Sequence, residues 1–144
     1  MFLRLDHAGI SVRDMERAIR FYEEIIGMEK VFDQTFETRL ADIIGYEGAK
    51  ARVVHMRLGD SVVELFDYQN PKGRIPPFTK NQSDFGLIHI GFLVRNFHKT
   101  YEMLKQKGVQ FLGEPVEIRE NVFVAYFHGV EFEIIEMREI QGTH

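Results

Sequence analysis

Two histidines stand at matched positions of an internal repeat. The segments Leu5–Arg13 (LDHAGISVR) and Leu87–Arg95 (LIHIGFLVR) are identical at five of nine positions at an offset of 82, and they bring His7 and His89 into register. Apolar residues alternate along both segments, which is typical of a strand with one face packed on a helix. A single strand histidine is more often structural than a ligand, but a matched pair favours a shared chemical role.

Two carboxylates form a second matched pair. Glu64 (in VVELF) lies five residues after Gly59, and Glu133 (in VEFEI) lies four residues after Gly129. Both are flanked by apolar residues, where an unpaired charge is costly, although two solvated glutamates on half-exposed strands remain the alternative. Glu131 shares a strand face with Glu133 and is the alternative ligand or a base.

His7, His89, Glu64 and Glu133 together predict a metal site. Two imidazoles and two carboxylates suit one borderline divalent ion, namely zinc, nickel, cobalt, manganese or iron. The two carboxylates balance the charge of the ion, and four ligands leave two positions open on an ion that prefers six. Vicinal oxygens of a substrate can occupy them as a chelate, which polarises a carbonyl and stabilises an enediolate or alkoxide.

A tight hairpin adds one more candidate. If the chain turns at Gly59-Asp60, His55 lies opposite Glu64 on the same face of the sheet. The same construction in the second half puts Val124 opposite Glu133, so His55 has no counterpart there. We predict that His55 orients Glu64 or transfers a proton, the alternative being a solvated strand histidine.

The elements that position these residues repeat as well. Each strand that carries a histidine is followed by a helix, the first from a cap at Asp14 to Gly27 and the second from a cap at Asn96 to Gly108. Each half ends in a hairpin. The predicted hairpin strands are 51–58 and 61–68 in the first half, and 121–127 and 130–137 in the second. A strand near 31–36, followed by an irregular stretch or a short helix near 39–44, completes the first half.

Composition restricts the class of function. The chain has 144 residues, of which 44% are hydrophobic and 28% charged, and this favours one soluble globular domain. Its net charge of −4 disfavours nucleic acid and anionic membrane surfaces as partners. The absence of cysteine excludes disulfides, thiol nucleophiles and iron–sulfur clusters. Without a long apolar run or an apolar leader, a cytoplasmic location is expected, and terminal His144 is expected to be disordered.

The paired H-x-G strands, the V-E-L strand after a G-D turn and the terminal G-x-x-x-E strand resemble the vicinal oxygen chelate superfamily. Its members include glyoxalase (lactoylglutathione lyase), methylmalonyl-CoA epimerase, extradiol dioxygenases, and fosfomycin and bleomycin resistance proteins. The resemblance implies an α+β fold of two tandem βαβββ modules, which form an open cup-shaped mixed sheet with helices outside. It covers 1–144 as one domain, with module 1 at about 1–68, a linker at about 69–86 and module 2 at about 87–138.

The resemblance also implies a ligand set, which is His7, Glu64, His89 and Glu133. A carboxylate at position 64 is similar to the glyoxalase pattern and speaks against a dioxygenase. The run before the last strand is shortened here, so the choice between Glu131 and Glu133 stays open. Whether one chain or two complete each site also stays open.

We therefore predict a metal-dependent, glyoxalase-like lyase or isomerase that moves a proton next to a metal-chelated carbonyl, with Glu64, Glu133 and His55 as its catalytic groups. The alternatives are a dioxygenase of the same fold and a non-catalytic protein that binds or sequesters a small molecule. Lys72, Arg74 and Lys80 in the linker favour an anionic substrate, the alternative being that these exposed cations are only solvated. The open sheet edges, together with the resemblance, predict a homodimer.

Overall fold

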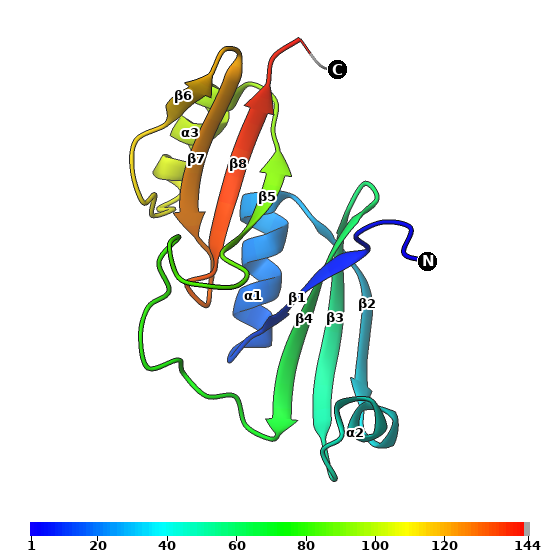
Figure 1. Cartoon of the computed structure of the whole chain (residues 1–144). Coiled ribbons are helices and arrows are strands. Elements are labelled where there is room, and N and C mark those ends of the chain that lie inside the picture. The colour runs from blue at the N-terminus through cyan, green and yellow to red at the C-terminus, as the bar shows by residue number, and fades with distance from the viewer. Residues whose placement is uncertain (143–144) are drawn as a thin grey trace. The chain divides into compact units, whose positions relative to one another are not determined.

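Two units, divided after Pro76, each repeat the order strand, helix and three strands. The computed structural model describes residues 1–142, so the expectation for His144 lies outside the described residues. Within those residues the units form two four-stranded sheets, and the predicted tandem βαβββ fold is confirmed (Figure 1). No helix in that range is long and apolar enough to cross a bilayer.

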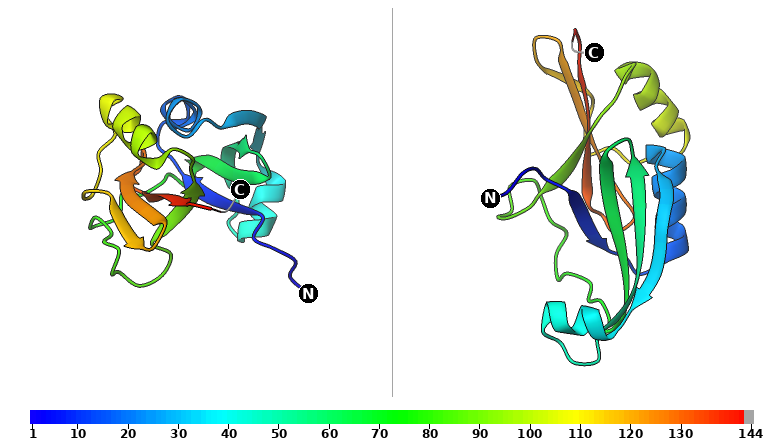
Figure 2. Two further views of the ribbon diagram at one scale, coloured as in Figure 1. Left: turned by 90° about the horizontal axis from the view of Figure 1, so that it is seen from above. Right: turned by 90° about the vertical axis from the view of Figure 1, so that its right-hand side faces the viewer.

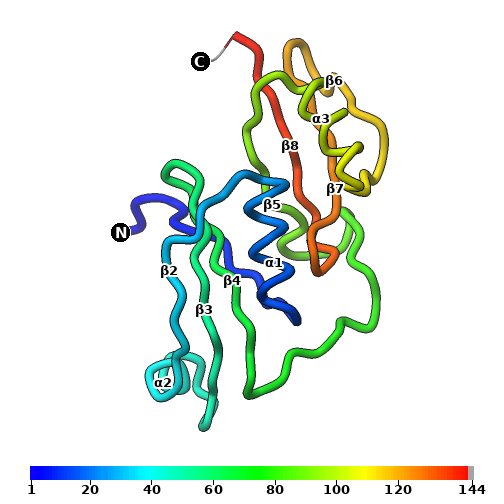
Figure 3. The backbone as a smooth tube through the Cα atoms, turned by 180° about the vertical axis from the view of Figure 1, so that it is seen from behind, coloured from blue at the N-terminus to red at the C-terminus, as the bar shows by residue number. Residues whose placement is uncertain are grey.

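The first sheet has the strand order β1-β4-β3-β2, with β1 parallel to β4. The elements of this unit are β1 (His7–Ser11), α1 (Met15–Phe21), the π-helical turn η1 (Tyr22–Ile26), β2 (Glu29–Phe36), α2 (Thr38–Ile44), β3 (Lys50–Leu58) and β4 (Ser61–Asn70). The predicted turn at Gly59-Asp60, the strand before α2 and the short helix are confirmed. Seen from behind, α2 lies at the end of the sheet away from that turn (Figure 3).

Helix α1 lies along one face of the first sheet (Figures 1 and 2). Asp14 caps it as predicted, because its Oδ1 accepts a hydrogen bond from Arg17 N at 3.1 Å. The helical segment ends at Gly27, whose φ of 85° suits a residue without a side chain. Helix α1 buries Met15, Ala18 and Ile19, η1 buries Tyr22, and the sheet buries Val54, Met56, Val63 and Leu65. The opposite sheet face is thereby left for polar chemistry.

The second sheet has the strand order β5-β8-β7-β6, with β5 parallel to β8. Its elements are β5 (His89–Leu93), α3 (Phe97–Gln106), β6 (Val116–Arg119), β7 (Val122–His128) and β8 (Ile134–Ile140). Asn96 stands at the predicted start of α3, but its side chain does not cap the helix. Glu139 does so instead, since its carboxylate accepts from Asn96 N at 3.0 Å and Phe97 N at 3.2 Å.

The predicted second hairpin is wrong in its returning strand. That strand was expected over 130–137, whereas β8 begins at Ile134 and runs to Ile140. The sequence pointed to Gly129 as the turn residue, but the left-handed backbone position is occupied by Phe132, with φ of 61°. Bulky residues rarely adopt that conformation, so the sequence carried no signal for a turn there.

An ion pair ties β2 and β3 together near α1. Arg52 donates to both oxygens of Asp33 at 2.9 and 2.8 Å and to Glu16 of α1 at 2.7 Å. The hydrogen bonds from Arg52 outweigh desolvation and lower the pKa of Asp33 from 3.8 to about 2. This pKa is lower in the folded than in the unfolded chain, so the contact stabilises the fold above about pH 4 and is lost toward pH 2.

We expect Asp33→Asn to lower the free energy of unfolding at pH 7 by about 1–2 kcal/mol, a range that allows for solvent screening. Between pH 4 and pH 2 the difference from wild type should shrink, because wild-type Asp33 is then being protonated. Urea unfolding across this range measures both effects. Asp60→Asn, at an exposed turn carboxylate, is the control, and an undiminished difference at pH 2 would contradict the assignment.

Candidate functional site

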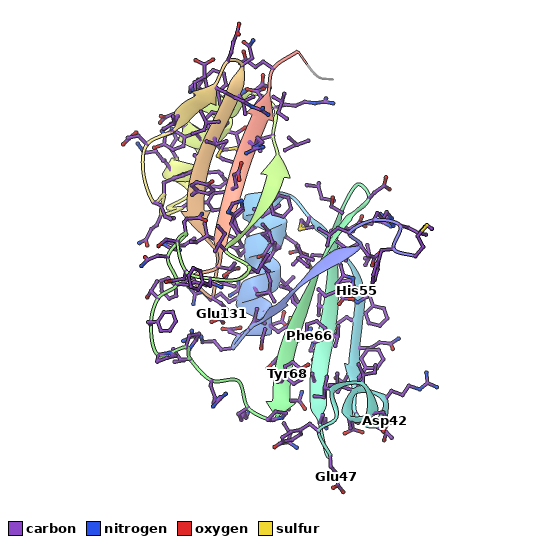
Figure 4. The ribbon with its side chains drawn as sticks, viewed as in Figure 1. Asp42, Glu47, His55, Phe66, Tyr68 and Glu131 are labelled. Atoms are coloured by element: carbon purple, nitrogen blue, oxygen red, sulfur yellow. The ribbon has the colours of Figure 1, made fainter. Side chains whose placement is uncertain are left out.

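Glu64 is the centre of a polar cluster in the first unit. It pairs in register with Gly9 of β1 on one side and with His55 of β3 on the other. Its Oε2 lies 3.0 Å from His7 Nε2 and its Oε1 lies 2.9 Å from His55 Nε2. The predicted pairing of His55 with Glu64 is confirmed, and Figure 4 shows His55 on β3 beside the strand that carries Phe66 and Tyr68.

Carboxylates face both nitrogens of His7. Its Nδ1 lies 2.9 Å from Asp6 Oδ2, while its Nε2 faces Glu64. The hydrogen bond to Asp6, with a smaller contribution from the charge of Glu64, raises the pKa of His7 against the opposing effect of desolvation. A neutral imidazole has a single N–H and can donate to only one of these carboxylates. The other contact requires a positive charge, supplied by a second proton or by a bound cation.

The second unit carries the matching pair, but its carboxylate is Glu136. Gly91 of β5 pairs with Glu136 of β8 as Gly9 pairs with Glu64. His89 Nε2 lies 2.9 Å from Glu136 Oε2, and its Nδ1 lies 3.1 Å from Gln82 Oε1. Glu136 is 4% exposed, and Arg138 Nε holds its other oxygen at 2.6 Å.

Glu133 does not occupy the position that the sequence predicted. It precedes β8, and its carboxylate accepts a hydrogen bond from Glu131 N at 2.7 Å. The expected pairing of Glu133 with Val124 is wrong, because Val124 pairs with Arg138. Glu131, the alternative ligand, lies in the same connection between β7 and β8 (Figure 4).

Sequence reasoning therefore missed Glu136, Arg138 and Gln82. A signal for Glu136 was present, because VVEL at 62–65 and IIEM at 134–137 share one pattern at an offset of 72. Gln82 lies in the segment interpreted as a linker, where no pattern pointed to it.

Three cations of the linker were expected to favour an anionic substrate. Lys80 donates to the carbonyl of Leu87 at 2.6 Å, and Lys72 and Arg74 are exposed.

The two His–Glu pairs have the chemistry of metal donors. Adjacent ligands of an octahedral ion with bonds of about 2.1 Å lie about 3 Å apart, and the paired atoms lie 3.0 and 2.9 Å apart. Each histidine also has its Nδ1 engaged, which leaves Nε2 for a cation. Within residues 1–142 there is no group of three or more such side chains arranged to hold an ion. Each unit by itself thus supplies one imidazole and one carboxylate.

The two central glutamates have different cross-strand partners. Tyr126 pairs with Glu136 where His55 pairs with Glu64, so the repeat is broken at this position. The His55 ring stacks on Phe32 with centroids 4.4 Å apart, which fixes its orientation. Burial, and then the charge of Glu136, raises the pKa of Tyr126. Glu64 is therefore contacted by the imidazole of His55, whereas Glu136 lies next to the phenol of Tyr126 and the guanidinium of Arg138.

A surface hollow of the first unit lies beside α2, away from these pairs. Its lining includes Glu37, Asp42, Tyr46, Glu47 and Lys50. Figure 4 shows Asp42 and Glu47 at α2 and His55 farther along the sheet. The hollow holds none of the matched residues, so the His–Glu pairs are the candidate site.

Comparisons with known proteins agree with this fold. Residues 4–133 match the model of the Glyoxalase/Bleomycin resistance protein/Dioxygenase superfamily. A 2-epi-5-epi-valiolone epimerase from Actinomyces sp is 30% identical over 148 residues, which cover 91% of this chain and 78% of that protein. Human mitochondrial methylmalonyl-CoA epimerase is 30% identical over 118 residues, covering 80% of this chain and 60% of its own length. A crystal structure of a glyoxalase family protein from Bacillus cereus has a TM-score of 0.88 at 24% identity, covering 99% of this chain and 97% of that one.

Proposed function

The chain belongs to the glyoxalase/bleomycin resistance protein/dioxygenase superfamily, and on that premise we propose that it is a metal-dependent lyase or isomerase. The reaction would move a proton at a carbon next to a carbonyl of a small substrate. Two epimerases among its relatives support this class of chemistry. The chain spans 60% of the human epimerase, so the substrate of that protein is carried over only as a candidate to be assayed.

The observation that supports the proposal is the recurrence of one His–Glu pair at the same register in both units. We propose His7, Glu64, His89 and Glu136 as the ligands, with Glu136 in place of Glu133. A divalent ion held there would polarise a carbonyl of the substrate and stabilise negative charge on its oxygen.

The homodimer stays a prediction. Measurement of the molecular mass by light scattering tests it.

Glu64 and His55 would handle the proton. Glu64 Oε1 and His55 Nε2 lie 2.9 Å apart, so a proton taken up by the carboxylate can pass to the imidazole. His55 is 30% exposed and can exchange that proton with solvent. The second oxygen of Glu136 is held by Arg138 instead, and a guanidinium does not accept a proton. The proposal therefore assigns proton transfer to the first unit.

Incorporation of deuterium from D2O at the carbon next to a carbonyl tests the reaction. We expect the metal-loaded protein to exchange that hydrogen in at least one of methylmalonyl-CoA, 2-epi-5-epi-valiolone and lactoylglutathione, as followed by NMR. Removal of the metal by a chelator should abolish exchange and its return should restore it. Exchange that survives chelation would contradict metal dependence. Tight binding of these compounds without exchange would favour a binding protein over an enzyme.

Metal content distinguishes Glu136 from Glu133. We expect Glu136→Gln to lower metal affinity at least tenfold, because it removes the charged donor opposite His89 Nε2. Glu133→Gln, the matched control, should leave metal affinity within about twofold. Titration of metal-free protein followed by elemental analysis measures both variants. The reverse ranking would show that Glu133 leaves its turn to bind the ion.

His55→Gln tests the positioning of Glu64. We expect a fall of about 10–100-fold in metal affinity or exchange rate, because the imidazole no longer holds Glu64 Oε1 or relays its proton. The melting temperature should change little, since the buried face of the sheet is untouched. His98→Gln, on α3, is the control. A large loss of stability with unchanged metal affinity would make His55 a packing residue.

A further inference from the structure

Arg138 occupies a position where the two halves of the repeat differ most in charge. It pairs with Leu93 of β5 as Phe66 pairs with Ser11 of β1, so Arg138 and Phe66 are equivalent. Each lies two residues after the central glutamate of its unit, on the same face of its strand. A guanidinium therefore stands beside Glu136 where an aromatic ring stands beside Glu64.

Arg138 uses only part of its hydrogen-bonding capacity within the protein. Its Nε donates to Glu136 Oε1 at 2.6 Å, and among residues 1–142 Glu136 is the one hydrogen-bonding and ion-pair partner of the Arg138 side chain. The Glu136 side chain is 5% exposed, whereas that of Arg138 is 40% exposed. The contact at Nε holds the guanidinium plane in place and leaves the Nη groups accessible to a ligand.

Glu136, the counter-charge of Arg138, is also one of the proposed metal ligands. Its carboxylate is shared between His89 and Arg138. A bound divalent ion would draw on the same carboxylate, and Arg138 would then carry unbalanced positive charge. Its cross-strand neighbours, Leu93 and Val124, are apolar and supply no counter-charge. Glu139, next in sequence, is engaged at the start of α3.

We propose that Arg138 binds an oxyanion of the substrate, a carboxylate or a phosphate, through the Nη edge of its guanidinium. The geometry of that group matches the two oxygens of either anion. This inference rests on the proposed metal-dependent function, because the metal both anchors the substrate and releases the charge of Arg138.

The strand spacing limits the distance between the chelating oxygens and the anionic group of the substrate. Two residues along a strand span roughly 7 Å, which is the separation expected between the Cα atoms of Glu136 and Arg138. An anion on Arg138 and oxygens on the ion held by Glu136 are then linked by a spacer of about two or three carbon atoms. The substrate class is thus a carbonyl compound that carries a carboxylate or phosphate two or three carbon atoms from its chelating oxygens.

Three hydroxamates test this inference, because their paired oxygens chelate a metal without help from Arg138. Butanohydroxamic acid has a neutral tail, succinic acid monohydroxamate ends in a carboxylate, and 3-phosphonopropanohydroxamic acid ends in a phosphonate that stands in for phosphate. Calorimetry with metal-loaded protein gives the affinity of each. We expect at least one charged probe to bind wild type about tenfold or more tightly than the neutral one, and the tighter of the two identifies the anion.

The variants are compared by the ratio of charged to neutral affinity, which cancels any change in metal affinity that all three probes share. Arg138→Gln should bring this ratio close to one, while Arg138→Lys should keep part of it, because an ammonium keeps the charge but loses the fork. Arg119→Gln, which removes an exposed arginine from β6, is the matched control and should keep the wild-type ratio.

Two failures are distinguishable. If the neutral probe binds but wild type shows no preference for charge, or if Arg138→Gln keeps the preference, the role of Arg138 is overturned and the metal-dependent function stands. If the protein takes up no metal, or metal-loaded protein binds no hydroxamate, the proposed function fails and this inference fails with it.

Discussion

An imidazole nitrogen faces a carboxylate oxygen at 3.0 Å in the first unit and at 2.9 Å in the second. In each unit the second nitrogen of the ring is engaged by Asp6 or Gln82, and the second oxygen by His55 or Arg138. With both partners held from behind, the facing atoms cannot turn away from each other. The lone pairs of an imidazole nitrogen and a carboxylate oxygen repel each other at this distance unless a cation lies between them. The arrangement therefore favours a proton or a metal ion between the two atoms.

The fold can hold such a pair because its stability comes from the other face of the sheet. Val54, Met56, Val63 and Leu65 are at most 3% exposed, and burying a side chain of this kind contributes about 1.5–3 kcal/mol. Exposed ion pairs contribute about 1 kcal/mol or less. The polar face can therefore be specialised for chemistry with little effect on stability. In both units a glycine pairs with the glutamate, so no side chain from β1 or β5 competes for that space.

Much of this arrangement follows from local sequence patterns. The repeat at His7 and His89 predicts the strands that carry them. Gly59-Asp60 marks a tight turn, so the pairing of His55 with Glu64 can be predicted from counting alone. The same reasoning gave the wrong register for the second hairpin. Its left-handed turn position holds Phe132, and a phenylalanine gives no turn signal in the sequence. An error in the start of β8 changes which glutamate faces the site, so the predicted start at residue 130 points to Glu133 and the observed start at Ile134 points to Glu136. Gln82 depends on a tertiary contact between a loop and a strand that no periodicity encodes.

The repeat is symmetric in its backbone and asymmetric in its chemistry. Glu64 and Glu136 have equivalent strand positions, yet one is backed by an imidazole that can accept a proton and the other by a guanidinium that cannot. If the two carboxylates balance the charge of one divalent ion, the positive charge of Arg138 is left without a counter-charge. That excess favours an anionic substrate and any negative charge that develops on its oxygens when a proton leaves. Divergence at a few positions of a duplicated module is therefore enough to give one His–Glu pair an imidazole partner and the other a guanidinium partner.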